Sequence, residues 1–152
     1  ELAGWAMTSD ARHFVAPRLG TVARCMAESL DMAGISVQGV ASVNAHATST
    51  KVGDRVEYQA LSTIFGDHLP PVSANKSLIG HALGASSAIE TIFAMEGMLR
   101  GTLLPTINYT LDPEIPLDCV AEGARRLDQE FVLKNSFGFG GCNACVVLHR
   151  TA

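Results

Sequence analysis

The sequence has few charged and few aromatic residues, and it contains no long apolar run. Only 17% of its 152 residues are charged and 6% are aromatic. The net charge of −4 gives no basic surface for binding nucleic acid. No apolar run approaches the roughly 20 residues that a membrane helix requires, and no signal-peptide pattern is present. We therefore expect neither a nucleic-acid partner nor a membrane-spanning segment.

The four cysteines and five histidines also lack the patterns of metal sites and disulfide frameworks. Cys142 and Cys145 have C-x-x-C spacing, but no second pair accompanies them. The histidines show no H-E-x-x-H or comparable ligand spacing. We expect no metal site, and we expect reduced cysteines that pack as small side chains, which fits a reducing, cytoplasmic location.

Apolar residues are abundant, at 47% of the chain. The length predicts one domain, residues 1–152, that is large enough to bury a core. Few charges combined with many apolar residues favour a surface that another half-domain or subunit covers. A compact, alanine-rich core is the alternative. The chain starts without methionine, which fits a piece of a longer protein.

Strand-like and helix-like segments alternate along the chain. Three segments repeat apolar residues at helical spacing, namely residues 19–33, 54–65 and 89–98. Five short segments have the composition of strands, namely residues 2–8, 40–44, 70–73, 131–136 and 143–149. Gly34 is a helix stop, Asp54 with Glu57 resembles a helix-capping pair, and residues 105–126 are expected to be irregular. This alternation predicts an α/β layered fold with a C-terminal antiparallel hairpin.

Two histidine segments and one glycine-rich segment stand out as candidate functional sites. They read N-A-H-A-T-S-T, N-K-S-L-I-G-H-A-L-G-A-S and N-S-F-G-F-G-G-C-N-A. Sites in open α/β sheets lie beyond the carboxyl ends of strands, which is where His46 and the segment after Ser73 fall.

The residues around each candidate leave two interpretations open. His46 can donate a ring N–H to a substrate, or it can bond a loop carbonyl. His81 near a helix start is favoured as a neutral donor, because the helix dipole disfavours imidazolium. Lys76 would reinforce this with Glu90 as its counter-ion, or it is a solvated surface lysine. The run around Phe139 lacks dinucleotide-binding spacing and predicts either a mobile, ligand-facing turn or a plain hairpin.

Together and in this order, the three segments resemble the C-terminal half of a beta-ketoacyl-acyl-carrier-protein synthase. This is a type II elongating condensing enzyme of the thiolase-like superfamily. The resemblance covers essentially the whole chain. It implies a thiolase-like layered fold, C-terminal half only, with a mixed sheet and helices on both faces. The nucleophilic cysteine of the family belongs to the N-terminal half and has no counterpart here.

The resemblance also implies a set of site residues. Its catalytic residues match His46, His81, Lys76 and Glu90. Its substrate-binding residues match Thr48, Thr50, Phe137, Gly138 and Phe139. Among these, the backbone N–H of Phe139 is expected to join the oxyanion hole, and its ring to act as a gate.

The implied reaction is decarboxylative condensation of an acyl thioester with malonyl-acyl-carrier protein. No cofactor is expected, because the phosphopantetheine arm arrives on the carrier protein. The expected partners are acyl-carrier protein, malonyl and acyl thioesters, the N-terminal half and a second copy in a homodimer. Without that half we expect no activity. A non-catalytic partner resembling a chain-length factor and a thiolase remain alternatives.

Four positions differ from the residues that are usual in the family that the chain resembles. Ala47 replaces a glycine, Lys51 a proline, Asn75 a threonine and Cys142 a threonine. None of these changes removes an expected catalytic role, but they leave the subfamily and the acyl-chain preference open.

Overall fold

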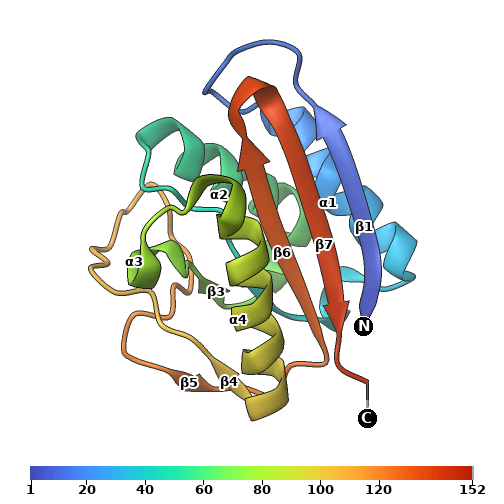
Figure 1. Ribbon diagram of the computed structural model, residues 1–152, viewed down its shortest axis with the longest axis vertical. Coiled ribbons are helices and arrows are strands. Elements are labelled where there is room, and N and C mark those ends of the chain that lie inside the picture. Colours follow the sequence, from blue (N-terminus) through green and yellow to red (C-terminus); the bar gives the residue numbers. More distant parts are fainter. Residues whose placement is uncertain (152) are drawn as a thin grey trace.

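A computed structural model describes residues 1–151 and shows one five-stranded mixed sheet with helices on both faces (Figure 1). In spatial order the strands are β1 (Leu2–Ser9), β7 (Cys142–His149), β6 (Phe131–Gly138), β2 (Val40–Asn44) and β3 (Val72–Ser73). The antiparallel strands β1, β7 and β6 form one side of the sheet, and the parallel strands β6, β2 and β3 form the other. The predicted α/β fold with a C-terminal antiparallel hairpin is confirmed.

Helices cover the two faces of the sheet unequally (Figure 1). The long helices are α1 (Leu19–Ala33), α2 (Lys51–Phe65) and α4 (Ser86–Arg100), and α3 (Lys76–Ile79) is a single turn. The main core lies between the sheet and α1 and α2, whereas a smaller cluster around Met98 and Val132 lies under α4. A second, small sheet pairs β4 (Thr102–Leu103) with β5 (Arg125–Arg126). Single 3₁₀ turns span Val37–Gly39, Gly66–His68, Leu83–Ala85 and Phe139–Gly141.

Alternation along β1 decides which of its side chains meet α1. Ala6 and Thr8 are buried on the α1 side, where Thr8 donates to the Thr21 carbonyl oxygen. The intervening Trp5 and Met7 are exposed on the opposite face of the sheet. The predicted helix stop is also confirmed, because Gly34 adopts a left-handed φ of 67° directly after α1.

Two local predictions were wrong. α2 begins at Lys51, so Asp54 lies inside its first turn and forms no capping pair with Glu57. His81 does not stand at a helix start, because a loop and a 3₁₀ turn separate it from α4. By contrast, residues 105–126 are irregular as predicted and contribute only the short strand β5 at their end.

Gly4 allows β1 to approach α1 closely. A Cβ at Gly4 would collide with the Ser29 carbonyl oxygen and lie 2.7 Å from the Ala33 nitrogen. Because α1 would have to move, Gly4→Ala is expected to lower the free energy of unfolding by about 1–3 kcal/mol. Gly20→Ala in α1 is the control, since a Cβ there meets nothing within 4 Å. In urea unfolding, Gly20→Ala should leave the free energy of unfolding unchanged or raise it by up to about 1 kcal/mol. Equal losses of stability in the two variants would contradict the prediction.

Candidate active site

The carboxyl ends of three parallel strands meet at one edge of the sheet. His46 follows the end of β2, and Lys76 follows the end of β3. β6 pairs with β2 only as far as Lys134, so Phe137 projects past that edge. The predicted placement of His46 and Lys76 beyond the strand ends is confirmed.

The two predicted histidines are neighbours in space. The ring centroids of His46 and His81 lie 5.9 Å apart, with the ring planes at 86°. Phe137 of β6 also packs against His46, with a centroid distance of 5.3 Å and an angle of 58°. The turn after β2 and the loop before α4 therefore bring both imidazoles to one place.

The contacts of His81 determine which ring nitrogen carries its proton. The Leu83 N–H donates to Nδ1 at 3.1 Å, and Ser86 Oγ lies 2.9 Å from the same atom. A neutral imidazole that accepts at Nδ1 carries its hydrogen on Nε2. His81 therefore offers an Nε2–H donor, while Ser86 at the start of α4 fixes the ring.

His46 is held through both ends of its backbone. Its N–H donates to Glu57 Oε1 at 2.8 Å, and its carbonyl oxygen accepts a hydrogen bond from Lys76 Nζ at 2.6 Å. The next N–H, from Ala47, donates to Glu57 Oε2 at 2.9 Å. Ala47 has a φ of 30°, in the left-handed region that costs L residues about 1–2 kcal/mol. The Glu57 carboxylate thus stabilises a strained turn directly after His46.

Glu57 is a site residue that the sequence pattern did not indicate. It is only 4% exposed, and it accepts a third hydrogen bond from Asn135 Nδ2 at 3.0 Å. Three N–H donors satisfy a buried carboxylate that would otherwise be costly. Its spacing from Asp54 was the only local signal, and that signal favoured helix capping instead.

A buried ion triad lies between α4 and the sheet. Glu90 of α4 is fully buried, with Oε1 2.6 Å from Lys76 Nζ and Oε2 2.7 Å from Lys134 Nζ. The predicted pairing of Lys76 with Glu90 is confirmed, and the alternative of a solvated surface lysine is wrong. No sequence pattern pointed to Lys134, the second cation of the triad.

Burial and nearby charge keep His46 neutral. Burial is the main reason that the pKa of His46 falls to about 3, and the positive charges of Lys76 and Lys134 lower it further. At neutral pH its imidazole therefore carries one proton and no charge.

The other predicted residues are close to His46 or Phe137 in the sequence. Thr48 Oγ1 and Thr50 Oγ1 are 3.3 Å apart, next to His46 in the sequence. Phe139 is 66% exposed and stacks on Phe14 with a centroid distance of 5.1 Å. Gly138, at the end of β6, is exposed. Phe137, rather than Phe139, is the phenylalanine of this segment that contacts His46.

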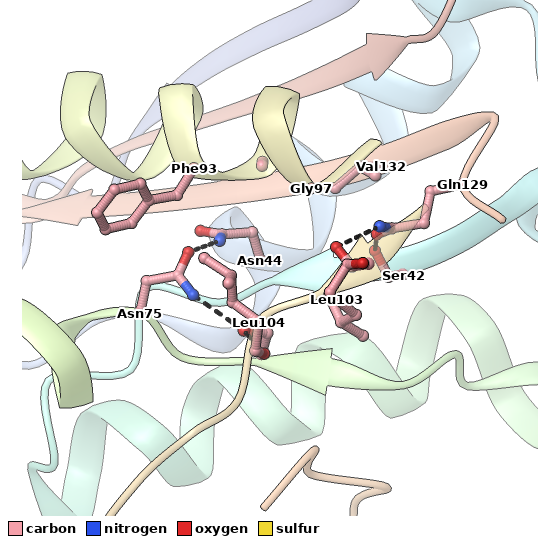
Figure 2. Close-up of a pocket in the computed structure, with 12 residues that line it drawn as sticks. Ser42, Asn44, Asn75, Phe93, Gly97, Leu103, Leu104, Gln129 and Val132 are labelled. Atoms are coloured by element: carbon pink, nitrogen blue, oxygen red, sulfur yellow. Dashed lines mark hydrogen bonds between the residues drawn. The ribbon is translucent and has the colours of Figure 1, made fainter. Parts of the chain in front are cut away.

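A small cavity with both polar and apolar lining residues lies under α4 (Figure 2). The side chains of Asn44 and Asn75 point toward one another there, and Asn44 Nδ2 donates to Asn75 Oδ1. Asn75 Nδ2 in turn donates to Ser73 Oγ at 3.0 Å. The cavity measures about 10 Å³, at the lower limit for one water molecule, and neither histidine lines it. It is an internal gap where β2 and β3 are tied together, directly before His46 and Lys76.

Within residues 1–151, no cluster of three His, Cys, Asp or Glu side chains is placed to hold a metal ion. Cys25, Cys119, Cys142 and Cys145 are all free thiols. No helix in the same part of the chain has the length and hydropathy to cross a membrane.

Comparisons with known proteins identify relatives of this chain. The family described as "Beta-ketoacyl synthase, C-terminal domain" matches residues 1–110. The chain is 42% identical to 3-oxoacyl-[acyl-carrier-protein] synthase 2 of Staphylococcus aureus, over 99% of this chain and 37% of that protein. The ishigamide ketosynthase/chain length factor has a TM-score of 0.96 at 36% identity, over 99% of this chain and 38% of that chain. A beta-ketoacyl synthase from Burkholderia phymatum has a TM-score of 0.95 at 40% identity, over 99% and 37%.

The mixed sheet and its close match to solved ketosynthase structures define a ketosynthase-type α/β domain. The chain belongs to the beta-ketoacyl synthase family, and it corresponds to the C-terminal part of these proteins. It spans a little more than a third of the length of the relatives that it matches.

The low pKa of His46 predicts a loss of stability in acid. The pKa of a histidine in the unfolded chain is near 6.5, whereas that of His46 in the folded chain is about 3. Between these pH values, His46 is therefore protonated only in the unfolded chain. The stability that neutral His46 contributes is complete above pH 6.5 and is lost as the pH falls toward 3. His46→Asn should therefore lose less free energy of unfolding than the unmodified protein between neutral pH and about pH 4.5, measured by urea unfolding.

Asp54 provides a comparison with the opposite sign. Burial and the charge of Glu57 raise its pKa from 3.8 to about 6. The stability that it contributes is complete below pH 3.8 and is lost as the pH rises through 6. Asp54→Asn should therefore lose more stability in acid than the unmodified protein. The reverse order of the two variants would show that these shifts are misassigned.

Proposed function

We propose that this chain supplies the two-histidine half of an active site for decarboxylative condensation of acyl thioesters with malonyl-acyl-carrier protein. The observation that carries the proposal is the adjacency of two imidazoles suited to donating hydrogen bonds. His46 is neutral because of its low pKa, and His81 has its proton on Nε2. Their centroid separation of 5.9 Å lets both donate to one oxygen between them.

Decarboxylation needs this arrangement because it creates an enolate. The bond between the malonyl carboxylate and the α-carbon breaks, and its electron pair moves toward the thioester oxygen as carbon dioxide leaves. Each fixed donor at such an oxygen is worth about 2.7–4 kcal/mol in a site that excludes water. The uncharged His46 and His81 therefore stabilise charge that develops during the reaction, with no proton transfer required.

The second step joins two carbon atoms. The α-carbon of the enolate attacks the carbonyl of an acyl group held as a cysteine thioester, and the thiolate leaves as the 3-oxoacyl product forms. The hydrogen bonds of Cys25 and Cys145 go to the Ala6 carbonyl and to Asn135, within the core. We assign the nucleophile to the N-terminal half, as the family resemblance implies.

The outer residues are proposed to handle the substrate. Thr48 and Thr50, with hydroxyls 3.3 Å apart, would bind the phosphopantetheine arm of the carrier protein. That arm belongs to the substrate, so the protein has no cofactor of its own. The exposed ring of Phe139 would gate the pocket, its N–H would join the oxyanion hole, and Gly138 and Phe137 would line the acyl side. We propose a cytoplasmic homodimer as the complete protein.

Half-reactions with the intact gene product test this function. His46→Asn and His81→Asn should each slow carbon dioxide release from malonyl-carrier protein by about 10²–10³-fold, because each removes a donor to the enolate oxygen. His68→Asn is the control, since this exposed residue follows α2, at the far end of about 22 Å of helix from the site. Residues 1–152 alone should give no 3-oxoacyl product.

Two results would change the proposal. Turnover by residues 1–152 alone would contradict the proposal that the active site is shared between two halves of the protein. An intact protein that releases no carbon dioxide, yet changes the product length of a partner synthase, would favour the chain-length-factor alternative. That alternative is relevant because a ketosynthase/chain length factor is among the structural relatives.

We further propose that the N-terminal half covers an apolar surface on the α4 side of the sheet. We define this α4-side surface by Trp5, Met7, Ile92, Met95 and Leu99, each at least 45% exposed. Figure 1 shows α4 in front of the sheet and no element in front of β1 and β7. Exposed apolar side chains gathered on one side are typical of interfaces. The relatives extend well beyond the matched region, which provides a segment to cover this surface.

A charged residue on the α4-side surface should break this association. Leu99→Lys is expected to weaken binding between residues 1–152 and the separately expressed preceding segment by at least about tenfold, measured by calorimetry. Leu111→Lys is the matched control, because Leu111 is as exposed but lies in the irregular segment 105–126. Equal affinities for the two variants would contradict the proposed interface.

A further inference from the structure

Lys134 is a buried lysine whose three ammonium hydrogens are all used. It is 2% exposed, and its Nζ donates to Glu90 Oε2 at 2.7 Å, to the Asn135 carbonyl oxygen at 2.6 Å and to Ser136 Oγ at 2.8 Å. None of the proposed roles so far involves this side chain. A buried cation with a full set of acceptors is costly to build, and it is retained most readily where its position matters.

Consecutive residues of β6 reach two buried glutamates on opposite faces of the sheet. Lys134 points toward α4 and contacts Glu90, whereas Asn135 points toward α2 and contacts Glu57. Because neighbouring side chains on a strand point to opposite faces, two consecutive residues of β6 hydrogen-bond both buried carboxylates.

The two glutamates lead to the same peptide unit. Glu57 accepts the N–H of His46 directly. Glu90 lies against Lys76, which donates to the carbonyl oxygen of His46. Two chains of contacts therefore run from β6 to His46, one ending at its N–H and the other at its C=O.

Removing the charge of Lys134 would disturb the second chain. Glu90 Oε2 would lose its only buried cation, and an unpaired buried carboxylate oxygen is strongly unfavourable. Lys76 is the remaining ammonium within reach, so it would be drawn toward both oxygens of Glu90 and away from His46. The imidazole of His46 would then lose its fixed relation to His81.

We propose that Lys134 is a positioning residue that fixes His46 for decarboxylation by holding Glu90, and through it Lys76, in place. This inference rests on the proposed function of the histidine pair. Lys134 touches neither imidazole through a hydrogen bond and takes no part in proton transfer. Its contribution is to keep the carbonyl oxygen of His46 hydrogen-bonded to Lys76, and so to keep the imidazole of His46 in a fixed position relative to that of His81.

The two half-reactions of the intact gene product separate positioning from general damage. Lys134→Met keeps the length of the side chain and removes its charge. It should lower kcat for carbon dioxide release from malonyl-carrier protein by about ten- to a hundredfold, the size expected for a misplaced donor. KM for malonyl-carrier protein and the rate of acyl transfer to the cysteine should stay within about twofold, because neither depends on the Lys76–His46 bond.

Val132→Ala is the matched control. Val132 lies two residues earlier on the same face of β6, is buried and packs in the cluster under α4. It should lower the melting temperature while leaving the ratio of the two half-reactions unchanged. Lys134→Gln, which keeps hydrogen-bond donors without the charge, should show a smaller selective loss, and it serves as the test if the methionine variant does not fold.

Three outcomes would overturn the inference. They are an unchanged ratio of half-reactions in both Lys134 variants, an equal fall of both half-reactions, and failure of both variants to fold, which would make Lys134 only a folding requirement. If the unmodified intact protein releases no carbon dioxide from malonyl-carrier protein, the proposed function fails first. The two failures are therefore distinguishable.

Discussion

The position of His46 depends on hydrogen bonds to both ends of its own peptide unit. Glu57 fixes the N–H and Lys76 fixes the carbonyl, while the imidazole packs against Phe137 and His81. A ring fixed through its backbone remains free to use its nitrogens on a substrate. The requirement explains why buried charges come from α2, α3, α4 and β6 at once, since the two bonds to the peptide unit come from different elements.

The two kinds of strand pairing in one sheet have different consequences. Parallel pairing of β6, β2 and β3 aligns their carboxyl ends, which collects the site residues at one edge. Antiparallel pairing of β6, β7 and β1 extends the sheet away from α4. That extension leaves Trp5 and Met7 uncovered on the α4 side. The same topology thus collects the site residues at one edge of the sheet and leaves part of its α4 side uncovered. The uncovered part is consistent with a chain that matches only part of its relatives.

Local sequence predicts local structure here, but it does not predict the partners of buried charges. The end of α1 at Gly34 and the exit of β2 before His46 follow from short patterns, and both are confirmed. Glu57 and Asn135 are separated by 78 residues, and Lys134 and Glu90 by 44, so no short pattern could pair them. The Asp54–Glu57 spacing even favoured a wrong interpretation. Burial decides these contacts, and burial depends on how the whole sheet assembles.

The energetics of this centre argue that it is organised for chemistry rather than for stability. Replacing a buried ion cluster with apolar side chains of similar volume is often neutral or stabilising, so a cluster adds little to folding. Here two lysines and two glutamates are buried together, and Ala47 keeps a left-handed φ of 30° beside them. The formal charges of these four side chains balance, and the imidazole of His46 lies within the influence of the cations Lys76 and Lys134. A neutral imidazole held near cations can donate to an oxygen that gains negative charge, which is what the proposed condensation requires.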